Sequence, residues 1–222
     1  MFFVLLTSDH KNLFLKNMNF GKVHRIAIVG SHGVGKTTLA LRIATEYKKA
    51  GHNAIVVQES ARECPFRINE GQSHEATLWI ALNHCLKELN GLQRGYNVVV
   101  CDRSAFDSVV YDGMTDDCCK MVPHMSRFRD FCLDWLKGYN QVIFVEADDV
   151  LSNSIGDAVR STNEDFRRKI DRRYQYIINQ IADELGDRLT RLQFSSIRDI
   201  DLNIQSNRNV LCSVGQSSCL PS

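Results

Sequence analysis

The chain has 222 residues, a formal net charge of +1 and 44% apolar residues. This length suits one α/β domain, or one domain with a helical insertion. The near-neutral charge gives no general attraction to nucleic acid or to an anionic membrane. The sequence has no apolar run near the roughly 18 residues that a membrane-spanning helix needs. We therefore expect a globular protein without a membrane partner.

The two ends of the chain differ from its middle. The sequence begins Met-Phe-Phe-Val-Leu-Leu, but it lacks the basic start and the apolar length of a signal peptide. We predict that residues 1–17 are an upstream extension and that a single domain spans residues 18–206, with Met18 as an alternative start. Residues 207–222 are rich in serine and weakly patterned, which predicts a flexible tail.

Strand and helix patterns alternate between the two ends. Apolar runs typical of buried parallel strands lie at residues 26–29, 54–58, 96–101, 141–145 and 189–194. Helical spacing recurs at 38–49, 73–89, 126–137 and 164–185, with a short last helix predicted at 197–204. Residues 109–117 form an irregular, turn-rich segment. The alternation predicts a doubly wound parallel sheet with helices on both faces.

The strongest motif follows the first strand. Residues 30–37 read Gly-Ser-His-Gly-Val-Gly-Lys-Thr and fit G-x-x-x-x-G-K-[ST] at every fixed position. Backbone N–H groups of such a loop point at phosphate oxygens, and the next helix adds a positive dipole. Lys36 would then reach the β- and γ-phosphates, and the Thr37 hydroxyl would ligate Mg²⁺. The predicted phosphate-binding residues are Ser31, His32, Gly33, Val34, Gly35, Lys36, Thr37 and Thr38.

Asp102 and Arg103 directly follow the third apolar run. A carboxylate at that strand end can face the phosphate loop and hold Mg²⁺, as a Walker-B acid does. The alternative is that Asp102 caps the next helix. A guanidinium can bind two phosphate oxygens at once, which suits Arg103 to phosphoryl transfer. A salt bridge to a surface acid is the alternative for Arg103.

Glu59 ends the second strand, where an acceptor would sit in an α/β fold. Its carboxylate could take a proton from an attacking hydroxyl or orient that hydroxyl. Arg62 lies three residues further on and could hold a phosphate or carboxylate of the acceptor. A simple ion pair between Glu59 and Arg62 is almost equally compatible with the sequence.

Arginines are concentrated after the fourth strand. In a small kinase this segment is a lid whose arginines neutralise the transferring phosphoryl group and exclude water. Arg160 is the best candidate for that role, followed by Arg168 and then Arg167. The alternative is a solvated helix face, which is the usual meaning of a charge run.

Eight cysteines are present, but none forms a C-x-x-C pair or zinc-ribbon spacing. Several, such as Cys85 and Cys101, lie in predicted apolar faces. Buried free thiols in a reducing cytoplasm explain this usage better than disulfides or a metal site.

The phosphate loop, with Gln-Glu-Ser-Ala-Arg-Glu at 58–63 and Cys-Asp-Arg-Ser at 101–104, resembles the AAA-type P-loop ATPase-like kinases. These include the kinase domain of bifunctional nicotinamide-riboside kinases and thymidylate-kinase-like proteins. The resemblance covers residues 23–194. It implies a three-layer P-loop NTPase fold with a five-stranded parallel sheet in the order 2-3-1-4-5. Asp157 and Arg160 resemble the Asp-x-x-Arg of the family's lid, although Ala158 departs from the commoner glycine.

The resemblance implies transfer of the γ-phosphoryl group of ATP, with Mg²⁺, to a nucleoside, nucleotide or nicotinamide riboside. GTP remains an alternative donor. The predicted catalytic residues are Lys36, Glu59, Asp102, Arg103, Arg160 and Arg168. Glu59, Arg62 and Arg103 would bind the acceptor, while Thr37 and Asp102 would hold the metal.

Two other functions stay open. A nucleotide-dependent switch or regulatory ATPase or GTPase would use the same loop, but the sequence lacks the guanine-reading Asn-Lys-x-Asp pattern. A polynucleotide 5′-kinase would need a basic groove for its strand, which the near-neutral charge disfavours. The identity of the acceptor, the oligomeric state and the role of residues 107–123 are not determined by the sequence.

Overall fold

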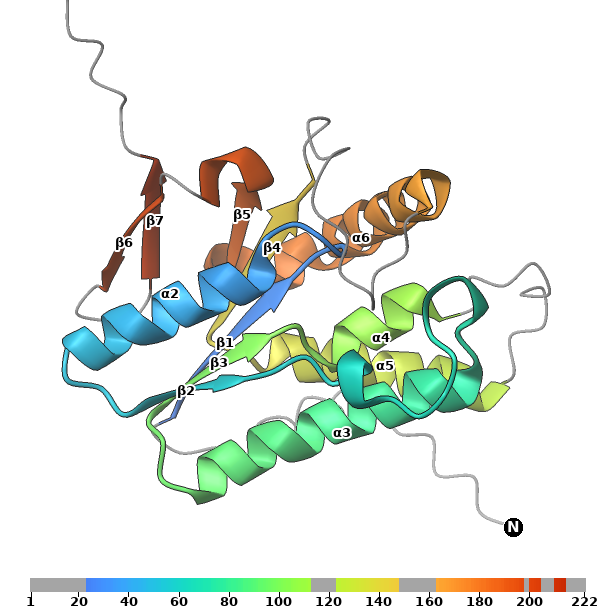
Figure 1. Ribbon diagram of the computed structural model, residues 1–222, viewed down its shortest axis with the longest axis horizontal. Helices are drawn as coiled ribbons and strands as arrows, with labels where there is room; N and C mark the ends of the chain where they lie inside the picture. Colours follow the sequence, from blue (N-terminus) through green and yellow to red (C-terminus); the bar gives the residue numbers. More distant parts are fainter. Residues whose placement is uncertain (1–22, 113–122, 148–162, 198–199, 205–209, 215–222) are drawn as a thin grey trace, which may run out of the picture.

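The computed structural model describes residues 23–112, 123–147, 163–197, 200–204 and 210–214. Its centre is a five-stranded parallel sheet with the strand order β2-β3-β1-β4-β5 (Figure 1). The strands are β1 (His24–Val29), β2 (Ala54–Val57), β3 (Val98–Asp102), β4 (Gln141–Glu146) and β5 (Leu189–Gln193). The predicted parallel sheet and its strand order are therefore confirmed.

β1 is the middle strand and carries the phosphate loop at its carboxyl end. It pairs with β3 on one side, where Ile26 lies opposite Val100, and with β4 on the other, where Ile28 lies opposite Ile143. All six residues of β1 are buried. An apolar strand that is buried on both faces is typical of a parallel sheet between helical layers. The loop therefore leaves the sheet at its centre, with β3 and β4 as neighbours.

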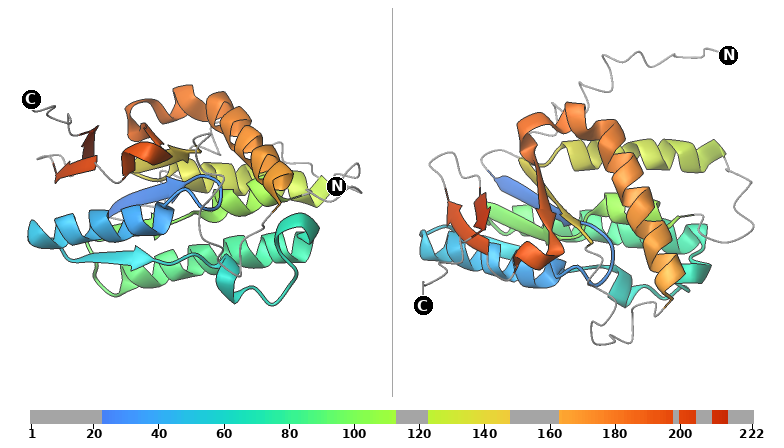
Figure 2. Two further views of the ribbon diagram at one scale, coloured as in Figure 1. Left: turned by 45° about the horizontal axis from the view of Figure 1, so that its top comes forward. Right: turned by 90° about the horizontal axis from the view of Figure 1, so that it is seen from above.

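Helices cover both faces of the sheet (Figures 1 and 2). Helix α2 (Lys36–Lys49) packs on one face through a core that includes Ile26, Ile28 and Val100. The other face packs against α3 (His74–Gln93), α4 (Ala105–Tyr111), α5 (Pro123–Lys137) and α6 (Glu164–Leu185). Because alternate strand residues point to opposite faces, the sheet supports two separate cores.

Helix α4 lies where part of an irregular segment was predicted, so the prediction is wrong for residues 109–111. A capping box explains its start, because the Ser104 N–H donates to the Asp107 carboxylate over 2.7 Å. Phe106, Val109 and Val110 are then buried against the sheet. The helix has only seven residues. This length is too short for helical periodicity to stand out in the sequence.

The carboxyl-terminal part also differs from the prediction. Ile200–Ile204 forms β6, which pairs antiparallel with β7 (Val210–Val214), so the helix predicted at residues 197–204 is wrong. Ile200, Leu202 and Ile204 alternate with polar residues, and this period of two suits a strand. A single 3₁₀ turn, Phe194–Ile197, precedes the hairpin. Strand β7 occupies part of the segment that we predicted to be a tail.

Other predictions have mixed outcomes. Helix α6 has the predicted bounds, and the side chain of Asn163 caps its first turn by accepting from the Phe166 N–H over 3.1 Å. Cys85, Cys101 and Cys132 are buried free thiols and Cys64 is a partly buried one, as expected. No helix among the described residues is long and apolar enough to cross a membrane. The predicted extension at 1–17 and the predicted lid residues Asp157 and Arg160 lie outside the described residues.

Candidate nucleotide and acceptor site

The phosphate loop connects β1 to α2 and depends on its glycines. A Cβ atom added to Gly30 would lie 2.4 Å from the Val145 carbonyl oxygen on the neighbouring strand β4. Gly33 and Gly35 have φ angles of 83° and 74°, in the left-handed region that other residues rarely adopt. The loop therefore passes close to β4 and bends sharply into α2, at positions where only glycine fits without strain.

Lys36 begins α2 and is folded over the loop. Its side chain is buried, and its ammonium donates a hydrogen bond to the Ser31 carbonyl oxygen. Burial, followed by the nearby Arg103 charge, lowers the Lys36 pKa to about 7. A phosphate anion bound in the loop would offset the cost of burying the charged ammonium, because its negative charge would stabilise the protonated lysine. The position suits a lysine that binds phosphate.

Thr37 and Asp102 place two hard oxygen donors together. The Thr37 hydroxyl donates to Asp102 Oδ2 over 2.6 Å, which brings the end of β3 to the first turn of α2. A hydroxyl and a carboxylate are the ligands that Mg²⁺ prefers, so these residues fit the ion that the fold implies. The alternative role of Asp102 as a helix cap does not apply, because Ser104 is the N-cap of α4.

Arg103 lies between the loop and a group of acids. Its φ angle of 80° is unusual for a non-glycine residue, and its Nε pairs with Glu59 Oε1 over 2.5 Å. Its Nη1 lies 3.5 Å from the Gly30 carbonyl oxygen and 3.5 Å from Asp107 Oδ1. Burial alone would lower its pKa, but Glu59 and other neighbours raise it well above its usual value. Arg103 is therefore not part of a surface salt bridge.

Glu59 is shared by two arginines. Besides Arg103, it pairs with Arg62, whose Nε lies 3.5 Å from Glu59 Oε2. Burial would raise the pKa of Glu59, but Arg103, Lys36 and Arg62 outweigh this effect and lower it. The carboxylate thus stays ionised, at the pocket edge nearest the loop. The ion pair between Glu59 and Arg62, which was the alternative hypothesis from the sequence, is therefore present together with the pair between Glu59 and Arg103.

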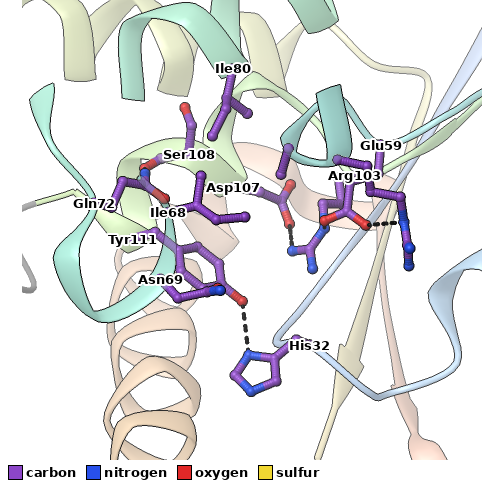
Figure 3. A pocket seen from close by; sticks show the side chains of 12 residues that line it. His32, Glu59, Ile68, Asn69, Gln72, Ile80, Arg103, Asp107, Ser108 and Tyr111 are labelled. Carbon is purple, nitrogen blue, oxygen red and sulfur yellow. Dashed lines mark hydrogen bonds and ion pairs between the residues drawn. The ribbon is translucent and has the colours of Figure 1, made fainter. Parts of the chain in front are cut away.

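These acids and arginines line one wall of a pocket beside the phosphate loop (Figure 3). Its other walls come from the two 3₁₀ turns after β2, Ala61–Glu63 and Asn69–Gly71, and from helices α3 and α4. The lining residues are His32, Glu59, Ala61, Arg62, Ile68, Asn69, Gln72, Ile80, Arg103, Asp107, Ser108 and Tyr111.

The start of α6 contacts the loop directly. The His32 ring stacks on Phe166 with centroids 6.3 Å apart, and its Nδ1 lies 3.3 Å from the Tyr111 hydroxyl. Burial raises the pKa of Asp171, while the Ser31 hydroxyl and Arg167 act in the opposite direction. Helix α6 therefore lies close to the phosphate site, next to the region predicted to contain a lid.

The predicted arginines of that region are only partly placed by the structure. Arg168 is exposed on α6 and lies 3.7 Å from Glu164, its partner one turn earlier. Arg167 is half-buried, with Asp171 as an electrostatic neighbour. Arg160 lies outside the described residues. Arg168 therefore lies on a solvated helix face. This position agrees with the alternative interpretation of the charge run.

Asp107, Gln72 and Ser108 are among the pocket residues that were not singled out in the sequence. Asp107 accepts from Ser104 and from the Tyr174 hydroxyl, over 2.7 and 2.6 Å, and thereby fixes α4 and the Arg103 side chain. The spacing Ser-x-x-Asp is a capping-box signal that could have identified this carboxylate. Gln72 and Ser108 carry no such signal, because only the packing of α3 against α4 brings them to the pocket.

Comparison with known proteins fits this geometry. The sequence profile of a family described as "AAA domain" matches residues 25–195. The chain belongs to the AAA domain family. Among solved structures, it is similar to thymidylate kinase from Ehrlichia chaffeensis, with 17% sequence identity and a TM-score of 0.53. That match covers 78% of this chain and 88% of the kinase chain. A search of the curated proteins gave no match.

At 17% identity the likeness to thymidylate kinase concerns the fold. It confirms a P-loop nucleotide-kinase fold for this member of the AAA domain family, in agreement with the strand order. The matched residues 25–195 contain the phosphate loop, Glu59, Asp102 and Arg103. They also contain the whole pocket lining.

Proposed function

We propose that this AAA domain protein is an ATP-dependent kinase that phosphorylates a small acceptor of the nucleoside, nucleotide or nicotinamide riboside type. The observation that carries the proposal is the position of Arg103. One guanidinium contacts both the Gly30 carbonyl of the phosphate loop and the Glu59 carboxylate of the pocket. A nucleotide in the loop and an acceptor in the pocket would therefore meet at this residue.

The chain's own residues supply the parts of a phosphoryl transfer. The loop N–H groups and Lys36 would bind the phosphates of the donor, and Thr37 and Asp102 would hold Mg²⁺. That ion would neutralise charge on the transferring phosphoryl group. Most of the rate enhancement in such a reaction comes from positioning and from electrostatic stabilisation.

The charges in the pocket favour a hydroxyl acceptor over a phosphate acceptor. The carboxylates of Glu59 and Asp107 face the guanidinium groups of Arg103 and Arg62, so these four charges cancel. A hydroxyl oxygen would form the new bond to the γ-phosphorus while the bond to the bridging oxygen of ADP breaks. The lowered pKa of Glu59 keeps its carboxylate ionised. The carboxylate would orient this hydroxyl and take up its proton as the new bond forms.

The test is a transfer screen with γ-labelled ATP or GTP, Mg²⁺ and a panel of nucleosides, mononucleotides, nicotinamide riboside and oligonucleotides. We expect label on at least one small alcohol acceptor and none with a Lys36→Ala variant. Transfer only to oligonucleotide ends would instead indicate a polynucleotide kinase. Tight nucleotide binding without transfer to any acceptor would contradict the proposal and favour a nucleotide-dependent switch.

A further inference from the structure

Gln72 is a buried amide on the wall of the acceptor pocket. It follows the 3₁₀ turn Asn69–Gly71 and precedes α3, and the residue is only 5% exposed. A carboxamide in such a position must satisfy two donors and one acceptor oxygen away from bulk water. Its hydrogen bonds therefore decide which of these groups a ligand would meet.

The protein uses the nitrogen of this amide. Gln72 Nε2 donates to Thr77 Oγ1 over 3.0 Å and to the Ser108 carbonyl oxygen over 3.3 Å. A backbone carbonyl can only accept, so the nitrogen must face Ser108 and the orientation of the amide is fixed. Both N–H donors are thus occupied by α3 and α4.

The oxygen of the amide has no such partner. Among the residues that the structure describes, none donates a hydrogen bond to Gln72 Oε1. This oxygen is not fully buried, since it keeps some accessible surface at the pocket wall. It is therefore open to a donor from a ligand or a water molecule. The Gln72 carbonyl oxygen is therefore an acceptor that a ligand in the pocket can reach.

The surroundings indicate what kind of group would bind there. Figure 3 shows Ile68 between Gln72 and the charged pair of Glu59 and Arg103, and Ile80 above them as a further aliphatic lining residue. Aliphatic walls suit the faces of a flat ring, whereas the charged end suits the hydroxyl that reacts. A ligand that spans the pocket would place its ring edge toward Gln72.

We propose that Gln72 Oε1 selects acceptors whose ring or ring substituent carries an N–H donor. The acceptor class is thus an alcohol joined to an amino-, amido- or imide-bearing heterocycle. This inference rests on the proposed function for the reacting hydroxyl, but binding alone can test it. Gln72 is then a specificity-determining residue, held in place by Thr77 and Ser108.

The test compares pairs of acceptors that differ only in the donor group. Suitable pairs are cytidine and its 4-deamino analogue, adenosine and its 6-deamino analogue, and nicotinamide riboside and its 3-acetylpyridine counterpart. Affinity is measured by calorimetry with protein loaded with Mg²⁺ and a non-hydrolysable ATP analogue. We expect the wild type to prefer the N–H member of at least one pair by about tenfold to a hundredfold.

Gln72→Leu should abolish that preference by weakening the N–H member alone. The matched control is Ile80→Val, a pocket-wall change that should weaken both members of a pair equally. Thermal melting checks that both variants are folded. A wild type without preference in any pair, or a Gln72→Leu protein that keeps it, would overturn the inference. Preferential binding without phosphoryl transfer would instead refute the proposed function and leave this inference standing.

Discussion

The hydroxyl of Thr37 donates a 2.6 Å hydrogen bond to the carboxylate of Asp102. The two residues come from the first turn of α2 and the last position of β3. Parallel pairing of β1 with β3 brings Ile28 opposite Asp102, so the sheet register itself carries this carboxylate to the phosphate loop. The bond brings a hydroxyl and a carboxylate oxygen together beside the loop, and under the proposed function these two residues would hold Mg²⁺.

We therefore predict that Asp102→Asn mainly weakens the use of Mg²⁺. An amide replaces a charged ligand by a neutral one, so the Mg²⁺ concentration for half-maximal transfer should rise at least about tenfold. Titration of activity with Mg²⁺ at saturating nucleotide measures this effect. Thr37→Ser keeps the hydroxyl and should stay close to the wild type. An unchanged Mg²⁺ requirement in Asp102→Asn would remove Asp102 from the metal site.

The carboxylate of Glu59 should matter for turnover more than for nucleotide affinity. Glu59→Gln keeps the size but cannot accept a proton, so kcat with a hydroxyl acceptor should fall by about 10²–10⁴. Steady-state kinetics with each substrate varied would separate this loss from a change in KM for ATP. Glu63→Gln is the control, because Glu63 is exposed in the neighbouring 3₁₀ turn and forms its ion pair with Lys87, away from the Arg103 side chain. Equal losses in both variants would argue against a role in the reaction.

Much of the fold was predictable because its signals are local. The glycines of the loop, the apolar strands and the periodicity of α6 each act within a few residues, and the structure confirms them. Ile200–Ile204 alternates apolar and polar residues, but five residues are too few for this period alone to exclude a helix. Its pairing with Val210–Val214 decides the outcome, and that contact is not visible in local pattern.

Outside the phosphate loop, the candidate site was predictable mainly at strand ends. Glu59 and Asp102 were found because parallel strands bring their carboxyl ends to one edge. The roles of Asp107 and Gln72 depend on how α3 packs against α4, which sequence spacing does not determine. The ion pair of Arg103 with Glu59 likewise joins the ends of two different strands, which the sequence does not place together. The sequence indicated only Arg62, three residues from Glu59, as an ion-pair partner.

Gly30 should tolerate no side chain. In Gly30→Ala the new Cβ would meet the Val145 carbonyl oxygen at 2.4 Å, so we expect loss of nucleotide binding and a destabilisation of about 1–3 kcal/mol. Gly95→Ala is the matched control, because its φ of 79° is also strained but nothing lies within 4 Å of the added atom. It should cost only the backbone strain, about 1–2 kcal/mol, and leave nucleotide binding intact. Nucleotide affinity by calorimetry and urea unfolding measure the two effects. Normal nucleotide binding by Gly30→Ala would show that the loop can move away from β4.

The buried ion pair between Arg25 and Glu88 should be important for stability but not for the site. Arg25 Nη2 lies 2.6 Å from Glu88 Oε2, both side chains are at most 3% exposed, and Trp135 and Tyr139 also donate to Glu88. Glu88→Gln would leave the Arg25 charge unpaired in the core, at a cost of about 3–5 kcal/mol.

The control for that variant is Glu46→Gln on α2, whose partner Lys49 is 66% exposed. Breaking this surface pair should change the free energy of unfolding by less than about 1 kcal/mol. Urea unfolding of both variants measures the difference. A cost for Glu88→Gln as small as that of the surface variant would mean that the buried pair does not stabilise the fold.

His84 should make the fold sensitive to mild acid. Burial lowers its pKa below the usual 6.5, although Glu88, 3.5 Å away, and Asp107 act in the opposite direction. Below pH 6.5 the unfolded chain therefore takes up a proton on this ring that the folded chain does not. The contribution of the neutral His84 ring to the free energy of unfolding is complete above pH 6.5. It is lost as the pH falls toward the folded-state pKa, by up to about 1.4 kcal/mol per pH unit.

A His84→Gln variant isolates this effect because glutamine is uncharged throughout. The carboxylates that also respond to acid are common to both proteins, so the difference between their stability curves reports on His84 alone. We expect the wild type to lose stability more steeply than His84→Gln between pH 7 and pH 5, as measured by urea unfolding at fixed ionic strength. Parallel curves would mean that the folded protein admits a charged imidazole beside Glu88, and that the buried Arg25–Glu88 pair can accept a third charge without cost.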